Sequence, residues 1–308
     1  MGSGPELVDM DDTDETDDPA VPGTARMGRT ALTVADLDAT VAFYRDVVGL
    51  TVQARGETAA TLGAGGSPVL ELLADEDAPP RDRGQTGLFH NAFRVPSRGA
   101  LGAALERVRD RGALDGASDH YVSEALYCTG PEGNGVEIYA DRPREEWPRA
   151  ADGSVEIGTA PLDLDALAAQ SDGAADAPPG TDLGHVHLEV SSLDRARTFY
   201  ADRLGLGVRT ETRGASFLAA GDYHHHVGVN TWNGRTDPAG GRGLAWFEFL
   251  VPDAGALATA RQRLSAADVP VSDREDGFAV TDPDGLTVRF RAAESEAGEG
   301  GREARQGL

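Results

Sequence analysis

The sequence repeats itself, and this duplication constrains the fold more than any other feature. Residues 37–52 read LDATVAFYRDVVGLTV, and residues 193–208 read LDRARTFYADRLGLGV. A second pair of segments, 93–101 (FRVPSRGAL) and 249–257 (FLVPDAGAL), has the same offset of 156 residues. Two independent matches at one offset indicate a duplicated unit of about 115 residues plus a linker.

Each copy is predicted to hold two smaller modules, and the first module shows the pattern. Residues 29–34 alternate like a strand, and Asp36 is a good N-cap for the helix that follows. Apolar residues then recur at helical spacing until Gly49 ends the helix. Further strand-like segments follow, the last at residues 69–73. The order is therefore strand–helix–strand–strand–strand.

The same order recurs three more times along the chain. The second module runs from a strand at 88–95 through a helix near 100–111 to two strands joined by the turn GPEGN at 130–134. The third and fourth modules occupy residues 183–232 and 243–291. Because one such module leaves an apolar sheet face exposed, modules should pair. We therefore predict an α+β fold in which four βαβββ modules form two half-open mixed β-barrels.

The composition along the chain suggests where the ordered parts begin and end. The first segment contains the run DMDDTDETDD and almost no large apolar side chain, and the last is rich in Gly and Glu, so both are expected to be disordered. The predicted organisation is an acidic tail at 1–25, a domain of modules one and two at 26–140, a linker at 141–181, a domain of modules three and four at 182–291, and a tail at 292–308.

Charge and cysteine content exclude several classes of protein. The 308 residues carry 52 acidic and 28 basic side chains, a formal net charge of −24, and such a field repels nucleic acid and anionic membranes. No apolar run approaches the ~18 residues of a membrane span, and the acidic N-terminus lacks a signal-peptide pattern, so we expect a cytoplasmic protein. The single cysteine, Cys128, excludes an internal disulfide and a cysteine-based zinc site, and a buried inert thiol is its expected role.

Histidines are the candidate functional residues. All seven lie in or beside strand-like segments: His90, His120, His185, His187, His224, His225 and His226. Together with Tyr127 and Glu137 they can build one mononuclear metal site surrounded by acid–base groups. Each residue also has a plainer interpretation, since a single histidine on a strand is usually a satisfied core residue and Glu137 can face solvent.

Several motifs carry a resemblance to a known family. The helix ends FYRDVVGL and FYADRLGL, the segment SEALY…PEGNGVEIYADRP and the segment YHHHVGVNTW resemble the vicinal oxygen chelate superfamily, which includes glyoxalases, bleomycin-resistance proteins and type I extradiol dioxygenases. The resemblance covers residues 27–291 and is closest to catechol 2,3-dioxygenase-like members with four modules. The extradiol signature of that family matches His120, residues 126–127, residues 131–133 and Glu137, and departs from it only at small or turn positions, Ser118 and Gly130.

The resemblance implies a set of metal ligands. In this superfamily one ligand lies on the first strand of a module, and the four equivalent positions here are Arg29, His90, His185 and Trp246. A second ligand position, on the last strand, is Glu137 in module two and Arg289 in module four. Only modules two and three therefore retain ligands, and His90, His185 and Glu137 would form a two-His-one-carboxylate site for Fe(II), with Mn²⁺ as a further candidate. Because the three must share one cavity, we predict that module two pairs with three and module one with four.

Catalytic roles also follow from the resemblance. It places His226 where extradiol enzymes carry the histidine that assists deprotonation and O₂ activation, and it assigns His120 and Tyr127 to hydrogen bonds with the substrate oxygens. His224 and His226 are predicted to share one strand face, because strand side chains alternate, and His225 is predicted to face away.

The leading hypothesis from the sequence is an Fe(II)-dependent extradiol ring-cleaving dioxygenase that acts on a small aromatic diol and O₂. The first alternative is a glyoxalase-type metal-dependent isomerase or lyase, with Zn²⁺ or Ni²⁺ and with His226 as a fourth ligand. The second alternative is a metal-free ligand-binding module of the resistance type, which needs an aromatic cavity and no ligand triad. The sequence leaves the substrate, the pathway and the oligomeric state open, and a homo-oligomer is one of the states that it allows.

Overall fold

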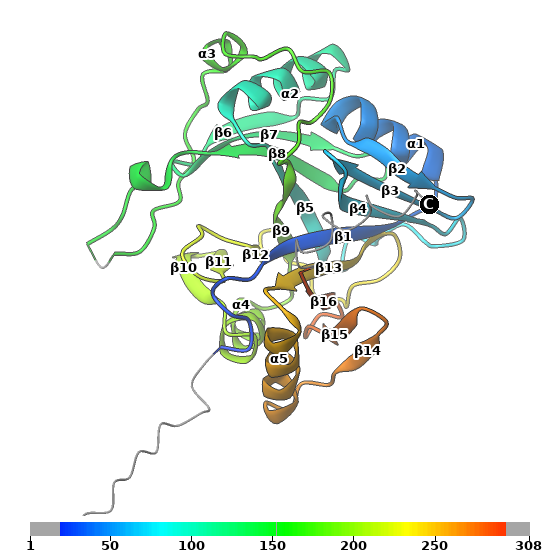
Figure 1. Ribbon diagram of the computed structural model, residues 1–308, viewed down its shortest axis with the longest axis vertical. Coiled ribbons are helices and arrows are strands. Elements are labelled where there is room, and N and C mark those ends of the chain that lie inside the picture. Colours follow the sequence, from blue (N-terminus) through cyan, green and yellow to red (C-terminus); the bar gives the residue numbers. More distant parts are fainter. Residues whose placement is uncertain (1–18, 152, 294–308) are drawn as a thin grey trace, which may run out of the picture.

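The computed structural model describes residues 19–151 and 153–293, and its strands lie between two groups of helices (Figure 1). Modules one and two each contain one strand, one helix and three further strands, as predicted. The elements of module one are β1 (Arg26–Val34), α1 (Leu37–Phe43), the π-helical turn η1 (Tyr44–Val48), β2 (Thr51–Arg55), β3 (Ala59–Ala64) and β4 (Ser67–Ala74). Those of module two are β5 (Gly87–Arg94), α2 (Arg98–Asp110), β6 (Gly116–Asp119), β7 (Ser123–Thr129) and β8 (Gly135–Asp141).

Modules three and four repeat this order after a connecting segment. The connection holds the short helices η2 (Arg144–Glu146) and α3 (Leu164–Ala168). Module three comprises β9 (Asp182–Glu189), α4 (Leu193–Arg197), the π-helical turn η3 (Thr198–Arg203), β10 (Gly207–Thr212), β11 (Ala215–Ala219) and β12 (Val227–Asn230). Module four comprises β13 (Gly243–Val251), α5 (Ala254–Ala266), β14 (Ser272–Arg274), β15 (Gly277–Thr281) and β16 (Thr287–Ala292).

The strands form two mixed sheets of eight strands each. One has the order β10-β11-β12-β9-β5-β8-β7-β6, so it joins module three to module two. The other has the order β14-β15-β16-β13-β1-β4-β3-β2, so it joins module four to module one. The predicted pairing of modules is confirmed. We name the first the cavity sheet and the second the ion-pair sheet, after the sites described below.

The helices begin as the sequence predicts. Asp36 caps α1 by accepting a hydrogen bond from the backbone N–H of Ala39, and Ser97, Ser192 and Asp253 occupy the same place before α2, α4 and α5. In modules one and three the helix widens into a π-turn before the segments VGL at 48–50 and LGL at 204–206. Gly49 then reverses the chain with a φ of 90°, in the left-handed region that glycine occupies most readily.

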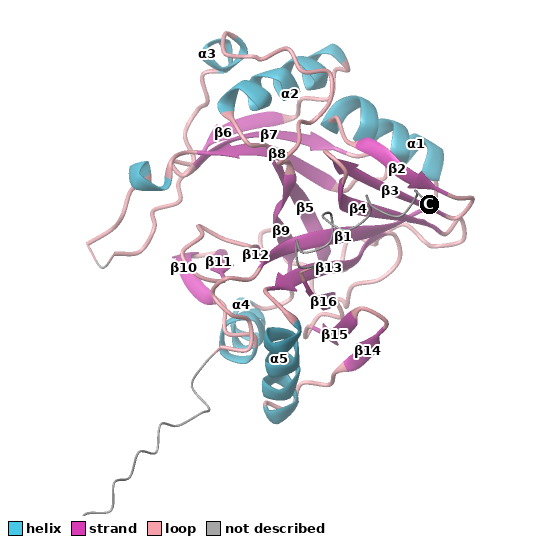
Figure 2. Cartoon of the chain, in the orientation of Figure 1, coloured by secondary structure: helices cyan, strands magenta, loops and turns pink. Residues whose placement is uncertain are grey.

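Helix packing and sheet pairing connect different modules. Consecutive modules pack their helices together, so α1 and α2 lie at one end of the molecule and α4 and α5 at the other (Figure 2). The two sheets meet near their middles, where the hydroxyl of Thr30 on β1 hydrogen-bonds the amide oxygen of Asn91 on β5 at 3.2 Å. One continuous apolar core therefore serves both sheets.

The ends of the described chain bear on the predicted tails. Residues 1–18 and 294–308 lie outside the described part, so disorder there stays a prediction. Residues 19–25, which were predicted to belong to the acidic tail, are part of the described structure: Val21 is 1% exposed and its N–H donates to the carbonyl of Leu204 at 2.8 Å. Within the described residues, no helix combines the length and apolar character needed to cross a membrane.

Candidate metal centre and substrate cavity

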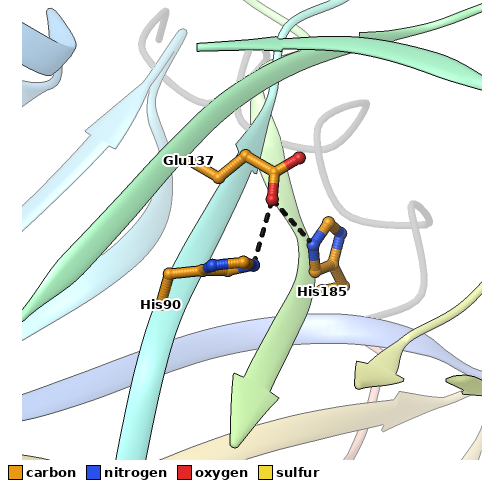
Figure 3. A group of neighbouring side chains, drawn as sticks. All are labelled: His90, Glu137 and His185. Atoms are coloured by element: carbon orange, nitrogen blue, oxygen red, sulfur yellow. Dashed lines mark ion pairs between the residues drawn. The ribbon is translucent and has the colours of Figure 1, made fainter. Parts of the chain in front are cut away.

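Three side chains from three adjacent strands of the cavity sheet converge on one point (Figure 3). Ala92 on β5 pairs with both Glu137 on β8 and His185 on β9, and His90 lies two residues before Ala92 on the same face. The ligand atoms of His90, Glu137 and His185 all lie within 4.8 Å of one another. Oε2 of Glu137 is 3.0 Å from Nε2 of His90 and 3.3 Å from Nε2 of His185.

The chemistry of this group fits a divalent metal. Burial lowers the pKa of His185 to about 4, so its imidazole is neutral at pH 7 and offers a lone pair. Burial opposes charge on Glu137 too, but the neighbouring His185 and His90 outweigh it and hold the pKa of Glu137 well below its usual range. Nε2 of His90 is buried and satisfied by no hydrogen bond. A buried carboxylate facing two imidazoles is the donor set that holds Fe(II) and related ions.

A cavity of about 450 Å³ opens beside these three residues. Its outer wall is aromatic: the ring centroid of Trp232 lies 5.4 Å from that of Phe89 and 5.1 Å from that of His187, and Phe217 completes the wall. Trp232 is 53% exposed and stands at the entrance. This volume and this apolar lining are those of a small-molecule site. His187, for which the sequence suggests no role, thus belongs to the wall.

His120 and Tyr127 form a hydrogen-bonded pair in the same cavity. Nδ1 of His120 donates to the carbonyl oxygen of Gly158 at 2.7 Å, so Nε2 of the neutral ring accepts from the hydroxyl of Tyr127 at 2.6 Å. Burial, and then the nearby Glu137, raise the pKa of Tyr127 well above its usual value. The phenol therefore stays protonated and directs its proton toward His120.

The segment predicted as a linker contributes to this cavity. Ile157, Gly158 and Thr159 line it, although they belong to neither neighbouring module. This role could not be predicted, because the segment has the composition of a connection. The contact of Gly158 with His120 spans 38 residues, and no local pattern encodes it.

The position of His226 differs from the prediction, and His225 takes its place at the cavity. Residues 224–226 form a loop before β12, so the alternation rule for strands does not apply to them. His225 lines the cavity, whereas Nδ1 of His226 accepts a hydrogen bond from the backbone N–H of Ala220 at 3.1 Å and its ring packs on Tyr223. Burial lowers the pKa of His226 to about 3, as expected for a packed, neutral ring.

Module three carries no carboxylate at the position that matches Glu137. Glu137 pairs with Ala92 in the parallel ladder of β5 and β8, and Gly228 pairs with His187 in the equivalent ladder of β9 and β12. A Cβ on Gly228 would lie 3.1 Å from the ring of His187. The imidazole of His187 therefore fills the space of the missing side chain, and the centre has three protein ligand positions rather than four.

The equivalent positions of the ion-pair sheet hold a salt bridge. Arg29 matches His90, and its guanidinium lies 2.5 Å from Glu71 and 3.3 Å from Glu248. Trp246 matches His185, and the guanidinium of Arg289 stacks 3.9 Å from its ring centroid. The histidine position is thus occupied by an ion-paired arginine in module one and by a tryptophan stacked on an arginine in module four.

The fold and the site together define a class of proteins: paired βαβββ modules with a two-His-one-carboxylate group above one mixed sheet. The model of the Glyoxalase/Bleomycin resistance protein/Dioxygenase superfamily matches residues 26–138 and 182–290. The chain belongs to this superfamily.

Similarity to individual proteins is consistent with this membership. The chain is 36% identical over 266 residues to a catechol-2,3-dioxygenase of Bacillus subtilis (strain 168), covering 83% of this chain and 93% of the relative. This relative supports an enzyme of the superfamily.

Two solved structures share the fold. One, from Bacillus subtilis subsp. subtilis str. 168 and provisionally described as a dioxygenase, superposes with a TM-score of 0.60 at 13% identity, over 88% of this chain and 86% of that one. The other is glyoxalase I from Zea mays, with a TM-score of 0.55 at 16% identity, over 87% of this chain and 92% of that one. At these identities the two structures establish the fold alone.

Proposed function

We propose that the protein is an Fe(II)-dependent extradiol ring-cleaving dioxygenase that acts on a small aromatic diol. The observation that carries this proposal is the number of protein ligands. His90, His185 and Glu137 converge, while the matching fourth position is Gly228. A three-residue site leaves coordination positions for a chelating substrate and O₂.

The choice of substrate class and metal rests on the catechol-2,3-dioxygenase that is 36% identical to this chain. A divalent metal bound by the three residues would supply a Lewis acid and a template for the diol and O₂. The remaining steps belong to the side chains around it. The aromatic wall of Phe89, Phe217 and Trp232 orients the ring of the substrate.

Acid–base chemistry would be divided between two places in the cavity. His225, rather than His226, faces the cavity and accepts the hydrogen of a diol O–H group. Across the cavity, the Tyr127 hydroxyl is held at 2.6 Å from His120 and hydrogen-bonds a substrate oxygen. His225 is buried and Tyr127 is partly buried, so the two groups can hold or move one proton without a large cost of solvent reorganisation.

The glyoxalase-type isomerase is the runner-up because glyoxalase I from Zea mays shares the fold. That interpretation needs a fourth protein ligand, and the residue expected for it, His226, accepts a hydrogen bond from the N–H of Ala220 and is not among the residues that line the cavity. The metal-free binding module is disfavoured by Glu137, a carboxylate that is 3% exposed and surrounded by two imidazoles.

The test is anaerobic metal analysis of the purified protein, followed by O₂ uptake with a panel of catechols. We expect stoichiometric iron, O₂ consumption and a yellow ring-opened product. His90→Ala and Glu137→Ala should lose both metal and activity. His187→Ala is the matched control, since it removes a cavity imidazole outside the ligand group and should keep the metal.

Other outcomes would favour another function. Bound zinc or nickel without O₂ uptake would favour the isomerase, and absence of any metal would leave the binding module. Full metal occupancy in His90→Ala and Glu137→Ala would contradict the ligand assignment. The domain boundaries, the cytoplasmic location and the absence of nucleic-acid and membrane partners stay predictions from the sequence, and a homo-oligomer remains one of the states it allows.

A further inference from the structure

A chain of hydrogen bonds runs from the end of β8 to His225 at the cavity, and its first two members, Asp141 and His224, have none of the roles above. It begins at Asp141, which lies four residues after Glu137 on the same face of β8. Oδ1 of Asp141 lies 2.9 Å from Nε2 of His224. Nδ1 of His224 lies 2.7 Å from Nδ1 of His225, and His225 lines the cavity.

The protons of this chain follow from the chemistry of its first member. An ionised carboxylate only accepts hydrogen bonds, so Nε2 of His224 must carry the hydrogen that it shares with Asp141. Nδ1 of a neutral His224 then holds a lone pair and accepts from Nδ1–H of His225. Nε2 of His225 is left with a lone pair, and it has no protein hydrogen-bond partner among the described residues.

The carboxylate at the start of the chain is held in place from two other sides. Nη1 of Arg94 donates to Oδ2 of Asp141 at 3.1 Å, and the hydroxyl of Tyr223 donates to both oxygens at 3.0 and 3.2 Å. Burial alone would raise the pKa of Asp141, but His224 and Arg94 outweigh it and lower that pKa below its ordinary value.

The imidazole in the middle of the chain is equally fixed. His224 is 0% exposed, and its ring packs against Tyr223 with centroids 4.1 Å apart and against Trp147 with centroids 5.2 Å apart. Rotation of the ring would break both of its hydrogen bonds inside this aromatic cage. His224 therefore donates to Asp141 through Nε2 and accepts from His225 through Nδ1. Because the ring cannot turn, Asp141 sets the direction of both hydrogen bonds.

We propose that Asp141 and His224 are positioning residues that hold His225 in the tautomer with hydrogen on Nδ1, so that its Nε2 accepts an O–H group of the bound molecule. The identity of that molecule as a diol rests on the proposed function, but the tautomer does not. His120 has the same tautomer by a different route, from the carbonyl of Gly158, yet its Nε2 is engaged by Tyr127. His225 thus supplies an imidazole acceptor to the cavity whose tautomer is set by the chain.

The substitution Asp141→Asn reverses the direction of the chain. Arg94 only donates hydrogen bonds, so it keeps the amide oxygen of the new residue on its side and turns the NH₂ group toward His224. Nε2 of His224 must then accept, its Nδ1 must donate, and Nε2 of His225 gains the hydrogen. Tyr223→Phe is the matched control, since it removes a contact to Asp141 and leaves the carboxylate.

The experiment is a long-range ¹⁵N–¹H correlation spectrum of the metal-free protein at pH 7, with the ring nitrogens of His224 and His225 assigned. In the unsubstituted protein we expect Nδ1–H with a bare Nε2 for His225, and the opposite for His224. Asp141→Asn should exchange both patterns and Tyr223→Phe should exchange neither. Hydrogen on Nε2 of His225, or a doubly protonated His224, in the unsubstituted protein overturns the proposal even if no variant folds.

A second measurement separates this proposal from the proposed function. In the iron-loaded protein, Asp141→Asn should lower kcat/KM for a catechol by about 10²- to 10⁴-fold, as loss of the correct tautomer does in a serine protease, while bound iron is unchanged. Unchanged kcat/KM in a variant whose tautomers have exchanged would overturn the role of the chain. If the unsubstituted protein has the expected tautomers but takes up no O₂, the proposed dioxygenase activity is contradicted and the tautomer proposal is not.

Discussion

The cavity sheet and the ion-pair sheet are built on one register and treat the same buried positions in opposite ways. In the cavity sheet a carboxylate, Glu137, faces two imidazoles. In the ion-pair sheet the matching carboxylate, Glu71, faces the guanidinium of Arg29. A guanidinium is a permanent cation attached to the chain, so the charge of Glu71 is already balanced and needs no bound cation. An imidazole is not a permanent cation, so the carboxylate of Glu137 can face an exchangeable cation.

The difference teaches that a sheet without the two histidines need not leave an unpaired buried charge. Arg29 stands at the position of His90 and supplies a cation to Glu71, and together with Arg291 it pairs with Glu248, which is 1% exposed. Charge balance is thereby kept within the chain, as burial of carboxylates requires. The four predictions that follow test how far this contrast holds.

The largest effect is expected from matched carboxylate substitutions. Glu137→Gln should weaken metal binding by at least about 100-fold, more than removal of a group that only supports a ligand. Glu71→Gln changes the equivalent residue of the ion-pair sheet and should alter metal affinity by less than about 2-fold. Anaerobic titration against a competing chelator measures both. Equal losses in the two variants would break the comparison.

A smaller effect is expected for stability. Arg29→Met leaves Glu71 without its cation, while Glu248 keeps its contact with Arg291 at 3.3 Å. The substitution should lower the free energy of unfolding by roughly 1–2 kcal/mol, below the full range for a buried pair because Arg29 is partly exposed. His90→Leu in the metal-free protein removes no permanent charge and should cost less than about 1 kcal/mol. Urea unfolding of both variants without metal measures the two losses. A larger loss in His90→Leu than in Arg29→Met would show that the group of His90, Glu137 and His185 stabilises the fold more than the salt bridge does.

The two sheets should also differ in their response to pH. The pKa is about 4 for His185 and about 3 for His226, both below the ordinary 6.5, so between these values the unfolded chain binds more protons than the folded chain. Stability is therefore full above about pH 6.5 and falls as the pH is lowered, by about 1.4 kcal/mol per pH unit for each group.

Urea unfolding of the metal-free protein between pH 7 and pH 5 measures this slope. His185→Phe should reduce the slope by the contribution of one group. Arg29→Met should leave it unchanged, because a guanidinium does not titrate in this range. A slope that is insensitive to His185→Phe would mean that this histidine is protonated in the folded state.

The smallest effect is expected at the entrance of the cavity. Trp232 is 53% exposed, so Trp232→Ala should change the free energy of unfolding by no more than about 0.5 kcal/mol. Affinity for an aromatic ligand should fall about 5- to 10-fold through the lost ring contact. Trp246→Ala, in the ion-pair sheet, should leave that affinity unchanged. Calorimetric titration with a catechol measures both affinities. Equal losses in the two variants would indicate that the ligand also binds at the ion-pair sheet.

Much of the architecture was predictable because the duplication carries register information. A fixed offset between copies locates the same strand position in every module, so the convergence of His90, His185 and Glu137 and the pairing of modules two and three followed without coordinates. The pairing was predicted because the candidate ligands lie in different copies and must share one cavity. Membership of the superfamily was recognisable from the same segments.

The rest depended on contacts that no local pattern encodes. Alternation identifies the inward side chains of a strand, but residues 224–226 form a loop, so the choice of His225 over His226 required the fold. The roof of the cavity at residues 157–159 is set by long-range packing of a connection. The ring of His187 occupies the space that a side chain at Gly228 would need, and this follows only from the pairing of β9 with β12.

The pairing of modules has a consequence for how the chain acquires its structure. The cavity sheet is formed by one continuous stretch, from β5 to β12, whereas the ion-pair sheet joins the first strands to the last. During synthesis the residues proposed to bind metal are all present before module four emerges, while module one must wait for a partner more than half the chain away. N-terminal segments fold first and distant pairings form slowly. We therefore expect the cavity sheet to form early and the ion-pair sheet to form last, when β13 pairs with β1.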